Sequence, residues 1–166
     1  MRYEMRRLSV GDDEAVYEML QEIPVYENGF ENNMNSRSFA EFKEWLRRCT
    51  HPDSKAVWGS WCTPQAFFWL YADGFPVGYG LIRHDSADKP SIPVGIAGYV
   101  IRPSQRNKGY GGKLLGMLVE EARKLNIDKL MLTIQNSNAA SLKIALHHGG
   151  IIEETTADKT HIAILC

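Results

Sequence analysis

The spacing of apolar residues near the N-terminus predicts a strand, a helix and a loop. Residues 3–8 suit a short strand, and the polar positions from Ser9 to Glu14 are typical of a helix start. The next apolar residues recur at i, i+3, i+4 and i+7, as on one buried helix face: Val16, Met19, Leu20 and Ile23. Pro24 ends this helix, and residues 25–37 are polar and rich in asparagine, so we expect a loop there.

A second helix and a hairpin are predicted downstream. Ser38 and Glu41 have the spacing of a capping box, which predicts a helix start. The apolar face of this helix consists of Phe39, Phe42, Leu46 and Cys49. Farther on, the apolar runs 66–71 and 77–82 flank Asp73-Gly74, a typical turn between antiparallel strands.

The second half of the chain predicts further strands and helices. A strand is expected at 96–101, a helix at 112–125 and a buried strand at 130–134. A helix at 138–148 is ended by a glycine pair, and the segment 151–165 suits two strands. This element order predicts an α/β (mixed α+β) fold with hairpins.

Composition supports one domain, 1–166, and excludes several classes of protein. A chain of this length, 44% apolar, can bury enough surface to fold without disulfides or a structural metal. Nineteen Lys and Arg against twenty Asp and Glu exclude a protein that coats DNA. The three cysteines form no CxxC pair, so we expect no metal site. The longest apolar run, 66–72, is much shorter than the roughly 20 residues of a membrane span, and no secretory signal is evident, so we expect a cytoplasmic protein.

The segment 102–113, RPSQRNKGYGGK, carries the most chemical information, and we call it the basic loop. It has four basic residues and no acidic residue, and it lies between a predicted strand and a predicted helix. Its glycines would let a ligand approach the unpaired N–H groups and the partial positive charge at the helix start. The pattern therefore favours a phosphate or pyrophosphate site over a glycine-rich turn with solvated basic side chains.

Three known motifs fit the basic loop poorly. A Walker loop needs glycine and a hydroxyl residue where Asn107 and Leu114 stand, and Leu114 also replaces the third glycine of the dinucleotide pattern. Residues 108–111, Lys-Gly-Tyr-Gly, match the start of an RNA-binding RNP1 strand. The residues that follow predict a helix instead.

The pattern that does fit is Arg/Gln-x-x-Gly-x-Gly/Ala, at residues 106–111. With the preceding strand and the Asn-Ala-Ala-Ser stretch from Asn138, it resembles the GNAT superfamily of N-acetyltransferases. The resemblance covers residues 96–150, and Pro76-Val77-Gly78 is similar to a bacterial branch of this superfamily. It implies a central, mostly antiparallel sheet with a splayed parallel strand pair, flanked by about four helices.

The resemblance also implies acetyl-CoA as co-substrate, without a metal. In this family the loop binds the CoA pyrophosphate through backbone N–H groups, and the preceding strand pairs with the pantetheine arm. The cofactor-binding residues expected by position are Tyr99, Val100, Ile101, Arg106, Asn107, Lys108, Gly109, Tyr110, Gly111, Gly112 and Asn138.

The usual catalytic side chains are missing, so the catalytic residues stay unassigned. The family often has a general base and a tyrosine acid at the positions of Thr133 and Ala145. A lysine amine is only about 0.1% neutral at pH 7.5, whereas an α-amine is about one third neutral. We therefore expect either an acceptor amine of low pKa or a base located elsewhere.

Other polar and aromatic residues are candidates for the acceptor site. His84, Asp85 and Tyr79 lie in or after a predicted strand, where a loop or packing role is the simpler interpretation. His147 and His148 end a helix, where a cation favours the helix dipole. The aromatic candidates, which core packing also explains, are Trp45, Trp58, Trp61, Trp69, Phe67 and Phe68. The acidic candidates beside the 25–37 loop are Glu22, Glu27 and Glu31.

Three functional hypotheses follow. The first is an N-acetyltransferase that acts on an amine of a small molecule or peptide, as a monomer or homodimer, without nucleic acid or membrane partners. The second is a catalytically idle CoA-binding or sensing domain. The third is an RNA-binding module, which the net charge disfavours.

Overall fold

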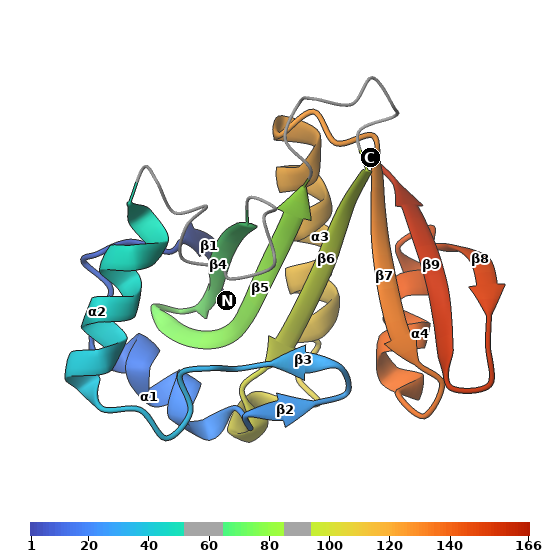
Figure 1. The fold of residues 1–166 in the computed structure, drawn as a ribbon. Helices are drawn as coiled ribbons and strands as arrows, with labels where there is room; N and C mark the ends of the chain where they lie inside the picture. The colour runs from blue at the N-terminus through green and yellow to red at the C-terminus, as the bar shows by residue number, and fades with distance from the viewer. Residues whose placement is uncertain (52–64, 85–93) are drawn as a thin grey trace.

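The computed structural model describes residues 1–51, 65–84 and 94–166, and it has a central seven-stranded sheet (Figure 1). The strand order is β1-β4-β5-β6-β7-β9-β8, and only β6 and β7 pair in parallel. The strands of this sheet are β1 (Tyr3–Arg7), β4 (Gln65–Ala72), β5 (Phe75–His84), β6 (Val94–Ile101), β7 (Lys129–Gln135), β8 (Ile151–Thr155) and β9 (Lys159–Leu165). The predicted mixed fold with a mostly antiparallel sheet and a splayed parallel pair is confirmed.

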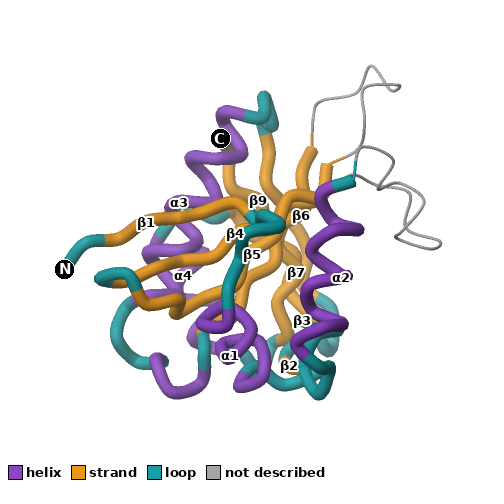
Figure 2. Tube along the Cα trace, turned by 90° about the vertical axis from the view of Figure 1, so that its left-hand side faces the viewer, coloured by secondary structure: helices purple, strands orange, loops and turns teal. Residues whose placement is uncertain are grey.

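Helices cover the two faces of the sheet (Figure 2). They are α1 (Glu14–Glu22), α2 (Phe39–Thr50), α3 (Tyr110–Lys124) and α4 (Ala139–His147), with a 3₁₀ turn at Pro103–Gln105. α3 and α4 lie on one face, and α1 and α2 lie on the other. The predicted capping box of α2 is present, because Ser38 and Glu41 each bond to the other's backbone N–H.

The loop predicted at 25–37 contains a small hairpin, so that prediction was wrong in part. β2 (Tyr26–Glu27) pairs with β3 (Phe30–Glu31) across Asn28 and Gly29, whose φ angles are 50° and 86°. Two consecutive left-handed residues are the signature of a type I′ turn, for which Asn-Gly is the preferred pair. The dipeptide was therefore a hairpin signal inside a polar segment.

Each face of the sheet has its own apolar core. Leu114 and Leu118 of α3 are fully buried on one face, and Met19 and Phe42 are fully buried on the other. α3 approaches the sheet closely, because a Cβ atom on Gly80 would lie 3.0 Å from Leu118. This close packing fixes the distance of α3 from the sheet. It therefore also fixes the position of the basic loop that leads into the helix.

The sheet opens between β6 and β7. Their pairing is confined to Val94–Ile96 and Lys129–Met131, after which the two strands diverge (Figure 1). In the part of the chain that the structure describes, no helix covers β7, β9 and β8 on the face opposite α4. We call the space between the diverging strands the gap.

Candidate functional site

Strand β6 turns the backbone groups of two residues toward the gap. The Arg102 N–H donates to Val77 on β5 at 2.9 Å. Because bonding direction alternates along a strand, the N–H and C=O groups of Tyr99 and Ile101 point away from β5, toward the gap. Val100 lies between them with its backbone toward β5 and its side chain buried on the α1 face. An extended ligand could therefore pair with β6 through Tyr99 and through the N–H of Ile101, whose carbonyl already accepts from Arg106 Nε at 3.1 Å.

The start of α3 lies at the end of this strand. Its N-cap, Gly109, has a φ of 82° and provides no side-chain cap, so the first N–H groups of the helix lack the usual partner. A Cβ atom on Gly111 would lie 3.0 Å from Ile144 and 3.7 Å from Tyr99, which shows how closely the helix start, α4 and β6 converge. This arrangement offers N–H donors and a positive dipole end to an anion.

The basic loop is less positive than its sequence suggests. Two of its four cations form ion pairs with acids from the N-terminal third of the chain: Arg102 with Glu22, and Arg106 with Glu27. Lys108 and Lys113 have no acidic partner among the described residues; Lys113 lies 5.2 Å from the ring centre of Tyr3. The expectation of an uncompensated positive loop is corrected accordingly, because residues far apart in sequence neutralise half of it.

Arg106 connects three parts of the site. Its Nε donates to the Ile101 carbonyl at 3.1 Å, and Nη1 and Nη2 donate to the two Glu27 oxygens at 3.0 and 2.5 Å. The guanidinium group thus joins the end of β6 to the β2–β3 hairpin. This side chain braces the basic loop from the α1 side, while the loop backbone stays available for a ligand.

A second brace lies beside the first. Arg102 is buried, with its guanidinium 4.6 Å from the ring centre of Phe75 and its Nε 2.7 Å from Glu22. Glu22 also accepts from the Ser104 hydroxyl at 2.7 Å. The hydrogen bond from Arg102 lowers the pKa of Glu22, with Ser104 acting in the same direction. Glu22 and Glu27, proposed from the sequence for the acceptor site, instead hold the basic loop.

The remaining predicted loop residues have separate places. Asn107, with a φ of 62°, and Lys108 are exposed at the turn before the helix. Tyr110 is buried against Tyr3, so only its backbone faces the loop. Asn138 caps α4 by accepting from the Ser141 N–H at 3.2 Å. Its side chain therefore stabilises the neighbouring helix.

Tyr99 places a buried hydroxyl beside the gap. Its side chain lies on the α3–α4 face, and its Oη has no hydrogen-bond partner among the described residues. Burial raises the pKa of this hydroxyl. An orphaned polar atom next to Gly111 is a donor that a bound molecule could satisfy.

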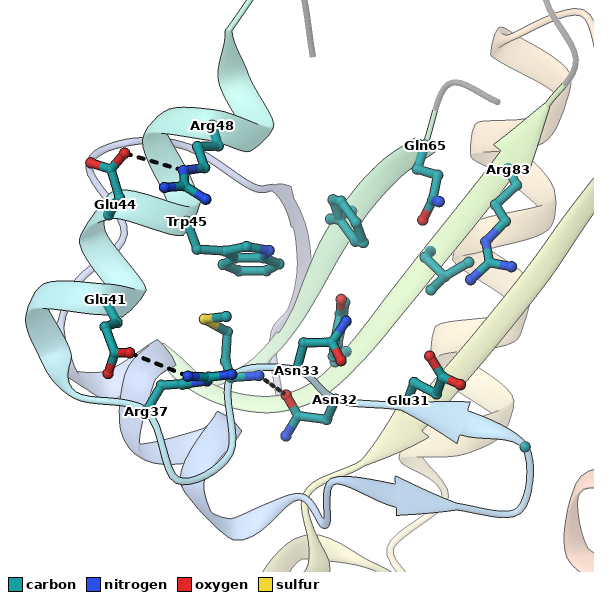
Figure 3. A pocket seen from close by; sticks show the side chains of 15 residues that line it. Glu31, Asn32, Asn33, Arg37, Glu41, Glu44, Trp45, Arg48, Gln65 and Arg83 are labelled. Carbon is teal, nitrogen blue, oxygen red and sulfur yellow. Dashed lines mark hydrogen bonds and ion pairs between the residues drawn. The ribbon is translucent and has the colours of Figure 1, made fainter. Parts of the chain in front are cut away.

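A separate cavity of about 790 Å³ lies between α2 and the sheet (Figure 3), and we call it the α2 pocket. Its described lining consists of Gly29, Glu31, Asn32, Asn33, Met34, Arg37, Glu41, Glu44, Trp45, Arg48, Gln65, Phe67, Tyr79, Leu81 and Arg83. Leu81 pairs with Gly98 of β6, so the floor of the pocket continues toward the gap. The aromatic candidates Trp45 and Phe67 line this pocket, 5.6 Å apart between ring centres.

The charges of the α2 pocket are unevenly paired. On the α2 wall, Glu41 is bound by Arg37 and Glu44 by Arg47 and Arg48. Glu31, on the opposite wall, has no ion-pair partner among the described residues. A cationic group that enters the pocket would meet Glu31 as the available carboxylate.

Several other candidates do not contribute to the pocket. Trp69 is fully buried in the core and donates from Nε1 to Asp12 at 2.7 Å. Phe68 is buried on the α3 face. Trp58, Trp61 and Asp85 lie outside the described residues, and of His84 only the backbone is described, at the end of β5.

Histidines at the end of α4 lie away from the pocket. His147 is exposed, and the ring of His148 packs against the glycines of α3, where a Cβ atom on Gly116 would lie 3.0 Å from it. Tyr79 is buried under the α2 pocket, with its ring centre 5.0 Å from that of Trp69. Burial raises the pKa of Tyr79 far above its ordinary value. Tyr79 is therefore no proton acceptor near neutral pH.

The positions of the usual catalytic pair differ in burial. Ala145 is fully buried, on the side of α4 that faces the core. Thr133 is exposed on β7 and exchanges a 3.1 Å hydrogen bond with His161 of β9.

Within the described ranges no group of three metal-ligating side chains occurs, and no helix is long and apolar enough to cross a membrane.

Comparison with known proteins places this geometry in a family. The model of the acetyltransferase (GNAT) family matches residues 24–149. The chain belongs to the GNAT family. The match includes the β2–β3 hairpin, the α2 pocket, the basic loop and α4, so the GNAT assignment covers the whole candidate site.

Solved GNAT structures share the fold at low sequence identity. The acetyltransferase of the GNAT family from Streptococcus pneumoniae gives a TM-score of 0.71 at 19% identity, covering 99% of each chain. Campylobacter jejuni N-acetyltransferase PseH in complex with acetyl coenzyme A gives 0.64 at 15% identity, covering 99% of each chain. Salmonella typhimurium yncA, a putative acetyltransferase with its cofactor acetyl-CoA, gives 0.66 at 17%, covering 99% of this chain and 94% of the other. None of the curated protein sequences compared with the chain matches it.

Proposed function

We propose that this protein transfers an acetyl group from acetyl-CoA to an amine of a small molecule or peptide. The observation that carries the proposal is the opening of the sheet between β6 and β7 next to an uncapped helix start. A pantetheine arm needs an extended backbone partner, and a pyrophosphate needs N–H donors at its end. Tyr99, Ile101 and the start of α3 supply both in one continuous path.

The residues proposed for acetyl-CoA have distinct tasks. Backbone N–H groups from Arg106 to Gly112 hold the pyrophosphate. Gly111 lets the start of α3 lie close to α4 and β6, because a Cβ there would be 3.0 Å from Ile144. The backbone of Tyr99 and Ile101 pairs with the pantetheine arm, and one of these N–H groups is placed to stabilise negative charge on the thioester oxygen. Arg106 holds the end of β6 and the basic loop together through its bonds to Ile101 and Glu27.

The acceptor amine is proposed to enter through the α2 pocket. Glu31 attracts its cationic form, and Trp45 and Phe67 cover its apolar part. The pocket floor leads through Leu81 to Gly98, at the edge of the gap where the acetyl group would lie. This geometry favours direct transfer between two substrates bound on neighbouring strands.

An idle CoA-binding domain is the second candidate function. The observation that favours it is Ala145, which leaves the usual acid position without a donor. The RNA-binding hypothesis loses its support, because Tyr110 begins a helix and is buried, whereas an RNP1 aromatic must be exposed on a strand. Turnover measurements separate the first two candidates.

Calorimetric titration with acetyl-CoA tests the binding half of the proposal. The wild type should bind, and Gly111→Trp should not, because its side chain would collide with Ile144 and Tyr99 and displace the helix start. Gly112→Asp and Gly112→Asn form a matched pair, because their side chains are nearly equal in size. Either side chain can be accommodated, since the nearest atom to a Cβ at this position is 3.8 Å away. Aspartate suits a helix N-terminus but repels phosphate, so Gly112→Asp should bind at least tenfold more weakly than Gly112→Asn. Equal affinity of this pair, or no binding by folded wild type, would contradict the proposal.

Thiol release with a panel of amines tests the transfer. Polyamines, amino acids and short peptides with free N-termini should be compared at pH 7.5 and pH 9. Acetylation of at least one amine class is expected, with loss of affinity for that amine in Glu31→Gln. Tight acetyl-CoA binding with no acceptor turned over would favour the idle domain.

A further inference from the structure

A histidine lies beside the gap, opposite a threonine whose position the family usually gives to a base. His161 is the direct β9 partner of Thr133 on β7, and Thr133 Oγ1 lies 3.1 Å from His161 Nδ1. Thr133 is exposed, and His161 is half-buried. The hydroxyl group thus belongs to the strand that borders the gap, and the imidazole stands one strand behind it.

Strand register places this pair level with the floor of the α2 pocket. Phe67, Leu81 and Gly98 are successive partners across β4, β5 and β6. Ile96 pairs with Met131 at the end of the parallel ladder, so Gly98 and Thr133 each lie two residues beyond that pair, on opposite sides of the gap. Side chains two residues apart lie on the same face of a strand, so all these positions share the α2 face of the sheet.

The amine and the acetyl group of the proposed reaction would meet along this row. Phe30 covers Gly98 from above, with ring atoms 3.6 Å from a Cβ built there. Beyond Gly98 the backbone opens, and on the α2 face no helix of the described chain covers β7 and β9, the strands that carry Thr133 and His161. An amine that passes from the α2 pocket around the edge of the Phe30 ring, rather than directly over Gly98, would then meet the Thr133 hydroxyl at the open side of the gap.

Resting on the proposed function, we propose that Thr133 and His161 form a proton relay that removes the proton from the acceptor amine. The ammonium form of the amine first gives a proton to Thr133 Oγ1, while the hydroxyl proton passes to His161 Nδ1. The neutral nitrogen then forms a bond to the acetyl carbon, the carbon–sulfur bond breaks, and its electron pair leaves with the CoA sulfur. The second proton on nitrogen passes through solvent to the CoA thiolate, and the imidazolium later returns its proton to water.

This assignment requires a particular state of the imidazole. Nδ1 must accept the threonine hydrogen bond, so the neutral ring carries its hydrogen on Nε2. Thr133 contacts the substrate, and His161 acts through it as a positioning and proton-accepting group. Thr133 and His161 together would thus replace the single basic side chain that the family often has at position 133.

Nearby charges on this face are arranged in two sets. Glu154 of β8 is the direct partner of His161, and Lys159 lies two residues before it on β9. Lys129 and Glu153 form an ion pair farther along the same face. The described neighbours of His161 therefore include one carboxylate and one ammonium group, and both belong in the interpretation of any pH profile.

Four variants test the relay against a merely structural role. Thr133→Val removes the hydroxyl at constant shape, and Thr133→Ser retains it. His161→Asn keeps an amide group close to the Nδ1 position but cannot take up a proton. His147→Asn is the matched control, because it makes the same change at an exposed histidine at the end of α4. All are folded if their thermal unfolding remains cooperative.

The relay predicts a selective loss of rate. Thr133→Val and His161→Asn should each lower kcat for the best amine by about 100-fold, within the range known for general base catalysis. Thr133→Ser should recover most of the rate, His147→Asn should have wild-type activity, and the Kd for acetyl-CoA should change less than twofold. Combining Thr133→Val with His161→Asn should add little further loss, because both interrupt one path. His161→Gly should be rescued by added imidazole.

Two results would overturn the inference alone. One is wild-type kcat in both Thr133→Val and His161→Asn while the wild type binds acetyl-CoA and acetylates an amine. The other is a nitrogen NMR spectrum of the free protein at pH 8 in which His161 Nδ1 carries the hydrogen. If the folded wild type binds no acetyl-CoA or acetylates no amine, the proposed function fails as well, so the two failures are distinguishable.

Discussion

Replacing Glu27 by glutamine decides what Arg106 does in the basic loop. If Arg106 braces the loop, as its bonds to Ile101 and Glu27 indicate, Glu27→Gln should weaken acetyl-CoA binding. If Arg106 must instead leave Glu27 to reach the pyrophosphate, the same substitution should tighten binding. Arg106→Met weakens binding in both cases, so the sign of the Glu27→Gln effect separates the two roles.

The size of the effect follows from the exposure of the ion pair. The side chains of Arg106 and Glu27 are 37% and 28% exposed. At this exposure, the contribution of the two charge-assisted hydrogen bonds to the free energy of unfolding lies between that of a surface ion pair and that of a buried one. We take it as about 1 kcal/mol. Such a loss lowers the melting temperature by roughly 2–4 °C in a protein of this size. The same loss of about 1 kcal/mol can lower the fraction of protein whose basic loop is in the binding conformation by at most about fivefold. The Kd for acetyl-CoA should therefore rise by at most about fivefold.

Calorimetry at about 0.3 M salt is the appropriate assay, because long-range attraction between the freed guanidinium and the ligand is then largely screened. Glu121→Gln serves as the control, since it breaks the ion pair with Lys124 at the far end of α3. We expect a two- to fivefold higher Kd for Glu27→Gln and no change for Glu121→Gln. A lower Kd for Glu27→Gln would refute the brace.

Three further predictions concern packing and ionisation. Gly80→Ala should destabilise the fold by about 1–3 kcal/mol in urea unfolding, because the new methyl would lie 3.0 Å from Leu118; additivity with Leu118→Ala would contradict this packing argument. Burial raises the pKa of the Cys49 thiol to about 12, so peptide mass spectrometry at pH 8 should find it alkylated at least 100-fold more slowly in folded than in urea-unfolded protein. Arg102 lowers the pKa of Glu22 below 4.5, so its contribution is present above that pH and lost as the pH falls through the folded value. Unfolding measured from pH 7 to pH 3 should accordingly show a smaller acid loss in Glu22→Gln than in wild type, and equal losses would exclude this contribution.

Local patterns were sufficient for most of the fold. The period of Val16, Met19 and Leu20, the capping box at Ser38 and the turn at Asp73-Gly74 each depend on neighbours in sequence, and each prediction is confirmed. The hairpin at Asn28-Gly29 was also a local signal, hidden because its strands have only two residues each. Short strands carry too little periodicity to be recognised.

The functional site depended on contacts that no local pattern contains. The basic loop at 102–113 was recognisable from its composition, but its pairing with Glu22 and Glu27 was not, because these partners lie about eighty residues away. The same holds for Thr133 and His161, which meet only through the β7–β9 register. Register across a sheet depends on the whole fold, so the sequence alone could not bring these two residues together.

The two braces of the basic loop also have a consequence for folding. Glu22 and Glu27 lie 80 and 79 residues from Arg102 and Arg106, so these contacts raise the contact order and form only when the two halves of the chain have docked. A fragment that holds the glycine motif alone would lack both braces. A ligand that binds only the completed loop then stabilises the native state by RT ln(1 + [L]/Kd), and the onset of that binding during refolding would mark the joining of the two halves.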